Sequence, residues 1–220
     1  MSRVVLFGTG AIARVVRFYL EHESTHEVVA FAVDRDHLQA DQFEGLPLVA
    51  FEELSRRYPP DDHAMFIAVG YRRMNAFRAE RCAQAQALGY ELVSHVSPRA
   101  TTWPGFQAGP NTIVMDQVII HPFAQVGDDV ILWSGSHVGH DSVIGAHCFV
   151  SSHAVVSGFV VVEERCFLGS NCTVRDGIRV ARECVIGAGA VVTRSTEPRA
   201  VYAAPQAVHL AATSDRLPNL

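Results

Sequence analysis

The chain has 220 residues, of which 49% are hydrophobic and 19% charged, and its formal net charge is −5 at pH 7. This composition predicts a globular protein of two domains, and the negative charge argues against nucleic acid as the main partner. No apolar run reaches the ~18 residues of a membrane span, and the opening residues, MSRVVLFGTG, lack the features of a secretory signal. We therefore expect a cytoplasmic protein whose thiols are reduced.

The chain begins with a strand, a glycine-rich turn and a helix. Val4–Phe7 reads as a buried strand, an amphipathic helix follows Ala13, and Val28–Val33 reads as a second strand that ends at Asp34. The turn, Gly8-Thr9-Gly10-Ala11-Ile12-Ala13, is a G-x-G-x-x-A variant of the dinucleotide fingerprint. Its glycines let a phosphate approach the helix N-terminus, and Asp34 can accept a hydrogen bond from a ribose or base edge. Alternatively, the glycines only tighten the turn and Asp34 only ends a strand.

A second strand–helix–strand unit follows. We expect a strand at Ala64–Val69 ending at Gly70, a helix over residues 71–89 closed by Gly89, and a fourth strand at Glu91–Val96. The alternation predicts a small parallel sheet with helices around it. Basic and polar residues beyond Gly70 either meet the phosphate or sugar of a ligand or form a solvated helix face; they are Arg72, Arg73, Asn75 and Arg78.

The rest of the chain is organised by a repeat of six residues. Every sixth residue from 120 to 192 is Leu, Ile or Val, and Val114 extends this series by one step: Ile120, Val126, Leu132, Val138, Ile144, Val150, Val156, Val162, Leu168, Val174, Val180, Ile186 and Val192. A period of six is divisible by two but not by 3.6, so it suits short strands rather than a helix. The pattern predicts a parallel β-helix in which three hexapeptides make one triangular coil and the aliphatic residues, here called rungs, fill its interior.

Small residues stand two places before most rungs, where a corner leaves little space. They include Cys148, Cys166, Cys172 and Cys184, and packing at these positions is enough to explain the four cysteines. The sequence has no CxxC pair, which argues against a zinc or redox site. We expect a nucleotide-binding domain of Rossmann type over residues 1–97 and the β-helix with a C-terminal tail over residues 98–220. The boundary is soft because Val96 and Thr102 already fit the hexapeptide phase.

Both halves resemble one family. The closing repeat VIGAGAVV (185–192), preceded by VVLFGTGAIARVV, VVAFAVD and FIAVG, is similar to the hexapeptide-repeat sugar acyltransferases with a left-handed β-helix, over residues 3–207. These include sialic acid O-acetyltransferases and N-acetyltransferases of UDP- or GDP-linked amino sugars. The resemblance implies acyl-CoA, here acetyl-CoA, as co-substrate, a homotrimer with sites between neighbouring prisms, and a role in bacterial surface polysaccharide or glycan biosynthesis. It also implies that the first domain holds the nucleotide-linked sugar, through Gly8, Thr9, Gly10, Asp34, Gly70 and Arg78.

The catalytic expectation centres on one of five histidines between residues 121 and 153. The family motif of a His, an acid and xxIG reads here His140-Asp141-Ser142-Val143-Ile144-Gly145. His140 stands two places past a rung, so it should project from the coil. Imidazole can take a proton near neutral pH, so His140 is the expected general base, with Asp141 orienting it. Gly158 stands one coil later. It either matches the family position whose N–H donates to the oxyanion, or it only avoids a steric clash at a corner of the coil.

Other family positions concern the acyl donor. Ser170 and Ala188 match positions that line the pantetheine path, and Arg194 is placed to meet a CoA phosphate. Trp133 stands where much of the family has Asn, and Phe149 replaces a His that can touch the acyl donor. These departures put the fit of acceptor and donor in question.

Two other classes compete with the transferase. One is a non-catalytic subunit that binds nucleotide sugars or serves assembly with a retained β-helix, which an intact His140-Asp141 pair disfavours. The other is a β-helical metal lyase. The β-helical carbonic anhydrases are of this class, and they bind their metal through three histidines, the last two of which are five residues apart. No pair of histidines in the cluster has that spacing; the cluster consists of His121, His137, His140, His147 and His153. We therefore expect no metal.

Overall fold

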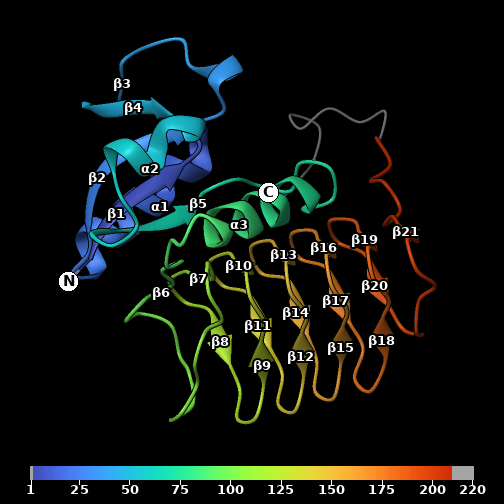
Figure 1. Ribbon diagram of the computed structural model, residues 1–220. Helices are drawn as coiled ribbons and strands as arrows, with labels where there is room; N and C mark the ends of the chain where they lie inside the picture. The colour runs from blue at the N-terminus through green and yellow to red at the C-terminus, as the bar shows by residue number, and fades with distance from the viewer. Residues whose placement is uncertain (1, 210–220) are drawn as a thin grey trace, which may run out of the picture.

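The computed structural model describes residues 2–209 and divides into an α/β domain and a triangular β-helix (Figure 1). The N-terminal sheet has the order β3-β4-β2-β1-β5, parallel except for the β3–β4 pair. Its strands are β1 (Arg3–Phe7), β2 (Glu27–Val33), β3 (Gln42–Phe43), β4 (Leu46–Ala50) and β5 (His63–Ile67). The helices are α1 (Ala11–Glu23), α2 (Leu54–Arg57) and α3 (Ala76–Ala87), with 3₁₀ turns at Arg35–His37 and Phe51–Glu53.

Both faces of this sheet are covered. Val4 and Leu6 of β1 pack with Val16 and Leu20 of α1, whereas the alternate residue Val5 packs on the opposite face against α2 and α3. Successive side chains of a strand point to opposite faces, so a strand covered on both sides must be apolar throughout. This is why residues 4–7 of β1 and 64–67 of β5 are continuous apolar runs in the sequence.

Strand β5 and helix α3 differ in their bounds from the sequence-based expectation. Strand β5 ends at Ile67 rather than residue 69, and α3 begins at Ala76 rather than 71. Residues 73–75 have left-handed backbone angles with φ between 52° and 61°, so they cannot continue a right-handed helix. The Asn75 amide instead donates to the carbonyl of Cys166 in the β-helix (3.2 Å), which ties this turn to the second domain.

The expected fourth strand, residues 91–96, is divided between the two domains. Leu92 forms a single bridge with Met65 of β5, and β6 (His95–Val96) pairs with β7 (Ile113–Val114) of the β-helix. The first pairing of the β-helix therefore lies before residue 97.

The β-helix is built from two-residue strands that, apart from the first and the last, end on a rung, and every rung is buried. Up to residue 174, each strand pairs in parallel with the strand eighteen residues later, as His137 pairs with Val155, which is the predicted three-hexapeptide coil. The last strand departs from this spacing, because Val185 pairs with Val201. The strands are β7 (Ile113–Val114), β8 (Ile119–Ile120), β9 (Gln125–Val126), β10 (Ile131–Leu132), β11 (His137–Val138), β12 (Val143–Ile144), β13 (Phe149–Val150), β14 (Val155–Val156), β15 (Val161–Val162), β16 (Phe167–Leu168), β17 (Thr173–Val174), β18 (Arg179–Val180), β19 (Val185–Ile186), β20 (Val191–Val192) and β21 (Val201–Tyr202).

These strands form the three faces of a prism. The first face, here called the covered sheet, has the order β21-β19-β16-β13-β10-β7-β6; the second sheet is β20-β17-β14-β11-β8, and the third sheet is β18-β15-β12-β9. The small residues before the rungs are buried, including all four cysteines of the repeat, as predicted. Their size lets the chain turn inward at each corner.

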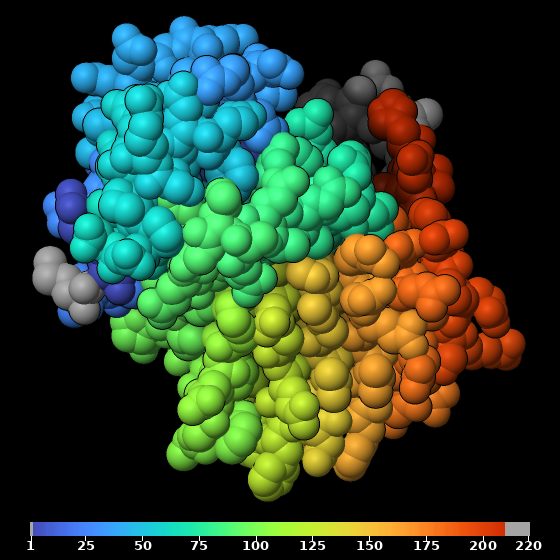
Figure 2. Space-filling view, in the orientation of Figure 1, coloured from blue at the N-terminus to red at the C-terminus, as the bar shows by residue number. Residues whose placement is uncertain are grey.

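The N-terminal domain lies on the covered sheet (Figure 2). Ile113, Ile131 and Phe149 on this sheet share an apolar cluster with residues of β1 and α1. At the edge of the contact the Tyr71 ring meets those of Phe149 and Phe167, with centroids 5.2 and 4.8 Å away. The corner between the second and third sheets is opposite the covered sheet, so the N-terminal domain leaves it free.

Candidate active site

His140 and Asp141 form a hydrogen-bonded pair on that opposite corner. This histidine corner is the turn that follows the strands of the second sheet, at residues 121–124, 139–142, 157–160, 175–178 and 193–196. His140 Nδ1 lies 2.9 Å from Asp141 Oδ2, and the two side chains are 51% and 41% exposed. When Nδ1–H donates to the carboxylate, the lone pair of the neutral ring is on Nε2. The pair can therefore accept a proton from an incoming group.

Gly158 lies one coil further along the same corner, against the His140 ring. A Cβ added at residue 158 would be 2.7 Å from His140 Nε2, closer than such atoms approach. Within residues 2–209 the Gly158 N–H donates no hydrogen bond. The absence of a side chain thus leaves Nε2 accessible beside an available backbone donor.

The N-terminal domain contains a pocket of about 500 Å³ at the carboxyl ends of β1, β2 and β5. Its lining includes Gly8, Thr9, Gly10, Asp34 and Gly70, all five of them expected from the sequence. Parallel sheets commonly bind ligands at this edge.

The glycines of the turn have distinct structural roles. Gly8 has φ of 118°, and a Cβ there would lie 2.8 Å from the Ala68 carbonyl oxygen, so only glycine fits. Gly10 caps α1, and a Cβ added to it would meet nothing within 4 Å. The first amides of a helix have no partner within the helix, and the first turn of α1 carries no acidic residue. Arg72 adds a positive charge to the same wall, so the pocket suits an anion.

Asp34 directly follows β2 at the rim of this pocket and already belongs to an ion pair. Arg81 Nη2 lies 2.8 Å from Asp34 Oδ1, and its guanidinium lies 5.0 Å from the Phe77 ring centroid. A ligand hydroxyl would therefore meet a carboxylate whose position is fixed by α3.

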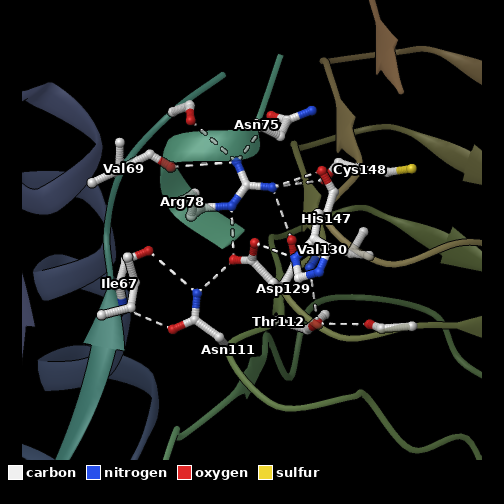
Figure 3. A network of polar contacts seen from close by, with 12 residues as sticks. Ile67, Val69, Asn75, Arg78, Asn111, Thr112, Asp129, Val130, His147 and Cys148 are labelled. Carbon is white, nitrogen blue, oxygen red and sulfur yellow. Dashed lines mark hydrogen bonds and ion pairs between the residues drawn. The ribbon is translucent and has the colours of Figure 1, made fainter. Parts of the chain in front are cut away.

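Arg78 is not in the pocket, contrary to the sequence-based expectation. Its side chain is fully buried between the domains, where Nε bonds Asp129 Oδ1 at 2.7 Å (Figure 3). The other guanidinium nitrogens donate to Asn75 and to several carbonyls on both sides, among them those of Gly70 and His147. Because its donors are all directed into this network, Arg78 joins the two domains and does not face a ligand.

The positions expected at the acyl donor lie on two different corners. Ser170 and Ala188 are exposed and one coil apart on the corner between the covered and second sheets. Arg194 is exposed on the histidine corner, three coils from His140, which corresponds to about 14 Å. Phe149, which replaces a family histidine, is buried under the N-terminal domain, and Trp133 packs beside it with ring centroids 6.3 Å apart.

The remaining histidines do not converge. His147 Nδ1 bonds Asp129 Oδ2 (2.8 Å) in the domain interface, and the rings of His121 and His137 meet on the second sheet with centroids 4.7 Å apart. Burial, followed by the neighbouring His121, lowers the pKa of His137. Among residues 2–209 no group of three His, Cys, Asp or Glu side chains could hold a metal ion. In the same range no helix is both long and apolar enough to cross a membrane.

One aromatic neighbour of His140 was not predicted from the sequence. The Phe159 ring packs against His140 with centroids 4.9 Å apart. The spacing of the repeat does predict that Phe159 lies near His140, because residue 159 is eighteen positions after Asp141 and so lies one coil above it.

Comparison with known proteins supports the transferase assignment. A family model described as bacterial transferase hexapeptide (six repeats) matches residues 123–158, and one described as hexapeptide repeat of succinyl-transferase matches residues 159–194. A search of the curated proteins finds no match.

Several solved structures are similar over almost the whole chain. PerB from Caulobacter crescentus, in complex with CoA and GDP-perosamine, is 28% identical, with a TM-score of 0.77 and coverage of 92% of each chain. A variant of the perosamine N-acetyltransferase from the same organism, with one histidine replaced by asparagine, is 27% identical, with a TM-score of 0.79 and coverage of 91% of this chain and 93% of that one. The acetyltransferase domain of PglB from Neisseria gonorrhoeae is 23% identical, with a TM-score of 0.79 and coverage of 91% and 96%, and supports the fold alone.

The fold is therefore the predicted one, an α/β domain followed by a left-handed parallel β-helix. The chain carries hexapeptide repeats of the bacterial transferase type, and its likeness to sugar N-acetyltransferases supports an enzyme of that kind.

Proposed function

We propose that the protein is an acyl-CoA-dependent acyltransferase. In this reaction an acetyl group moves from acetyl-CoA to an amino or hydroxyl group of a nucleotide-linked sugar, for the synthesis of a bacterial surface polysaccharide or glycan. The observation that carries the proposal is the His140–Asp141 hydrogen bond of 2.9 Å, with Nε2 against the side-chain-free Gly158. The complex of the similar PerB with CoA and GDP-perosamine supports the choice of substrates.

His140 acts as the general base. Nε2 takes a proton from the acceptor as its nitrogen or oxygen attacks the thioester carbonyl carbon. The new C–N or C–O bond forms, the C–S bond breaks, and the imidazolium returns the proton to the thiolate of CoA. Asp141 stabilises the charged ring, and the Gly158 N–H faces the oxyanion.

The N-terminal pocket holds the nucleotide of the sugar. The amides that begin α1, together with Arg72, receive the diphosphate, and Asp34 accepts a hydrogen bond from the ribose or base. Ser170, Ala188 and Arg194 serve the acyl donor, along the pantetheine and at a phosphate.

The proposal includes a homotrimer with shared sites. Within one chain the pocket and His140 are on opposite sides of the prism, because the N-terminal domain lies on the covered sheet and His140 lies on the corner facing away from it. A neighbouring prism that presents its histidine corner to the pocket would complete the site, and closed symmetry of this kind is common.

A thiol-release assay tests the activity. The protein is incubated with acetyl-CoA and a panel of UDP- and GDP-linked amino sugars and deoxy sugars, and free CoA is measured. We expect release that depends on one of these sugars, and His140→Asn should lower kcat by about 10²–10⁴-fold with an unchanged melting temperature. Sugar binding without thiol release would instead identify a non-catalytic binding subunit.

Subunit mixing tests the shared site. One preparation carries His140→Asn and lacks the base, and the other carries Gly10→Glu and has an altered pocket. If each site combines two chains, unfolding and refolding the two together gives more activity at low sugar concentration than the two preparations give when they are assayed separately and added. A refolded mixture no more active than that sum, or a monomer mass in light scattering of the active enzyme, contradicts the shared site.

A further inference from the structure

Two phenylalanines occupy an unfavourable backbone conformation on the histidine corner. Every sixth residue from 111 to 189 lies at a corner of the β-helix and has positive φ, and most of these positions carry Gly, Asn, Asp, His or a long polar side chain. Phe123 and Phe159 are the apolar exceptions among these corner positions, with φ of 66° and 56°. Their side chains are also 65% and 60% exposed. Neither backbone preference nor burial accounts for a Phe there, and such strain is found where function requires it.

Phe159 is in direct contact with the His140 side chain. The two rings are nearly perpendicular, at 88°, with centroids 4.9 Å apart. The backbone fixes this arrangement as well, because the Phe159 N–H donates to the His140 carbonyl oxygen at 3.0 Å. The left-handed conformation at residue 159 thus places an aromatic ring beside the imidazole.

The other restraint on His140 is weak by itself. Asp141 holds Nδ1, but both partners are about half exposed, and an exposed ion pair restrains its side chains little. A ring packed on the imidazole adds a second restraint from a different direction. With Asp141 at Nδ1 and Phe159 beside the ring, Nε2 remains next to Gly158.

We propose that Phe159 is a positioning residue for His140: its ring holds the imidazole in the orientation that keeps Nε2 available to the acceptor. This inference rests on the proposed function for its kinetic consequence, but the contact itself can be tested without catalysis.

Phe123 provides a matched control. It lies two coils from Phe159 on the same corner, with the same backbone conformation and a similar exposure. Its ring meets Trp103, with centroids 6.0 Å apart, rather than His140. Asn tolerates positive φ better than Phe, so replacement by Asn should leave the stability of the fold unchanged or raise it at either position.

The kinetic experiment compares Phe159→Asn, Phe159→Tyr and Phe123→Asn. We expect Phe159→Asn to lower kcat by about threefold to tenfold, the effect of losing one aromatic pair, with little change in either KM. Phe159→Tyr keeps the ring and should stay near wild type, as should Phe123→Asn. Equal kcat for Phe159→Asn and wild type overturns the proposal. A fall in kcat accompanied by a smaller particle mass also overturns it, since Phe159 would then be an interface residue.

The spectroscopic experiment uses the resting enzyme with isotope-labelled histidine. The His140 ring signals are assigned by their absence in His140→Asn. An adjacent aromatic ring displaces them, so they should shift in Phe159→Asn and stay in place in Phe123→Asn and Phe159→Tyr. Unchanged signals in Phe159→Asn would show that the rings are not in contact and overturn the proposal. If the signals shift but wild type transfers no acyl group, the proposed function fails and the contact stands.

Discussion

His140 Nε2 and Gly158 are so close that the enzyme has no room for a methyl group between them: a Cβ on residue 158 would be 2.7 Å from Nε2. The backbone of Gly158 is not in the left-handed region, so alanine is compatible with the main chain. The substituent would have to displace the imidazole, whose side chain is exposed and able to move.

We therefore expect Gly158→Ala to reduce kcat by about tenfold or more while the melting temperature stays within a few degrees of wild type. Steady-state kinetics with thermal unfolding measures both. In a His140→Asn background the same substitution should cost nothing further, because the displaced group is already absent. A full additional loss in the double variant would show that Gly158 acts independently of His140.

The second prediction concerns the N-terminal pocket. A Cβ at Gly10 meets nothing within 4 Å, so Gly10→Glu is sterically compatible with the fold, and a carboxylate at a helix N-terminus is favourable. The same carboxylate would repel a diphosphate at that terminus. KM for the nucleotide sugar should rise roughly tenfold or more and KM for acetyl-CoA should not change.

Gly10→Ala is the control for size without charge and should have a much smaller effect. Asp34→Ala should likewise raise KM for the sugar nucleotide alone. Equal weakening of both substrates by Gly10→Glu would mean that the pocket does not select the nucleotide.

The third prediction is a pH dependence of stability. Asp116 Oδ1 accepts hydrogen bonds from the Ser134 hydroxyl at 2.6 Å and from the Tyr19 hydroxyl of α1 at 2.5 Å, and these bonds lower the pKa of the carboxyl. A carboxyl with a lowered folded-state pKa stabilises the fold above its unfolded pKa. That contribution disappears as the pH falls from about 4 through the lower folded value.

Asp116→Asn should therefore cost about 1–2 kcal/mol at pH 7 and flatten the loss of stability below about pH 4, and Tyr19→Phe should cost about 1 kcal/mol. Urea unfolding at a series of pH values measures this. Asp176→Asn, at an exposed carboxylate paired only loosely with Arg175, is the control and should change neither quantity. An unaltered acid slope in Asp116→Asn would falsify the assignment.

The repeat determined how far the sequence could predict the structure. A rung every six residues specifies both the coil and the outward direction of His140, so the β-helix and the histidine corner followed from periodicity. The contacts between the domains could not be predicted from the periodicity, because they depend on how two separate folds pack against each other. Arg78 is an example: it stands eight residues after Gly70, and this position in the sequence is compatible both with contact to a ligand and with a role in the domain interface. The turn at residues 73–75 directs it to the β-helix. Phe159 was missed because its importance lies in one packing contact.

The last prediction concerns the ion pair of Arg78 and Asp129, which joins the two domains. Both side chains are almost completely buried, at 0% and 1% exposure, and Asp129 also accepts hydrogen bonds from Asn111 and His147 (Figure 3). Removing one member of a buried pair leaves the other as an uncompensated charge, which typically costs about 3–5 kcal/mol. Asp129→Asn preserves the shape of the side chain and suits the left-handed backbone at this position, so its effect isolates the charge.

We expect Asp129→Asn and Arg78→Met each to lower the free energy of unfolding by about 3–5 kcal/mol, measured by urea unfolding. The double variant should not regain wild-type stability, because Arg78 also satisfies buried carbonyls of both domains that Met cannot serve. Arg73→Met is the control: it breaks the exposed pair with Glu80 and should cost less than about 1 kcal/mol. If Asp129→Asn costs no more than Arg73→Met, the buried pair does not hold the domains together. The N-terminal domain would then be kept on the covered sheet by the apolar contacts and the remaining hydrogen bonds between the domains, such as that of Tyr19 with Asp116.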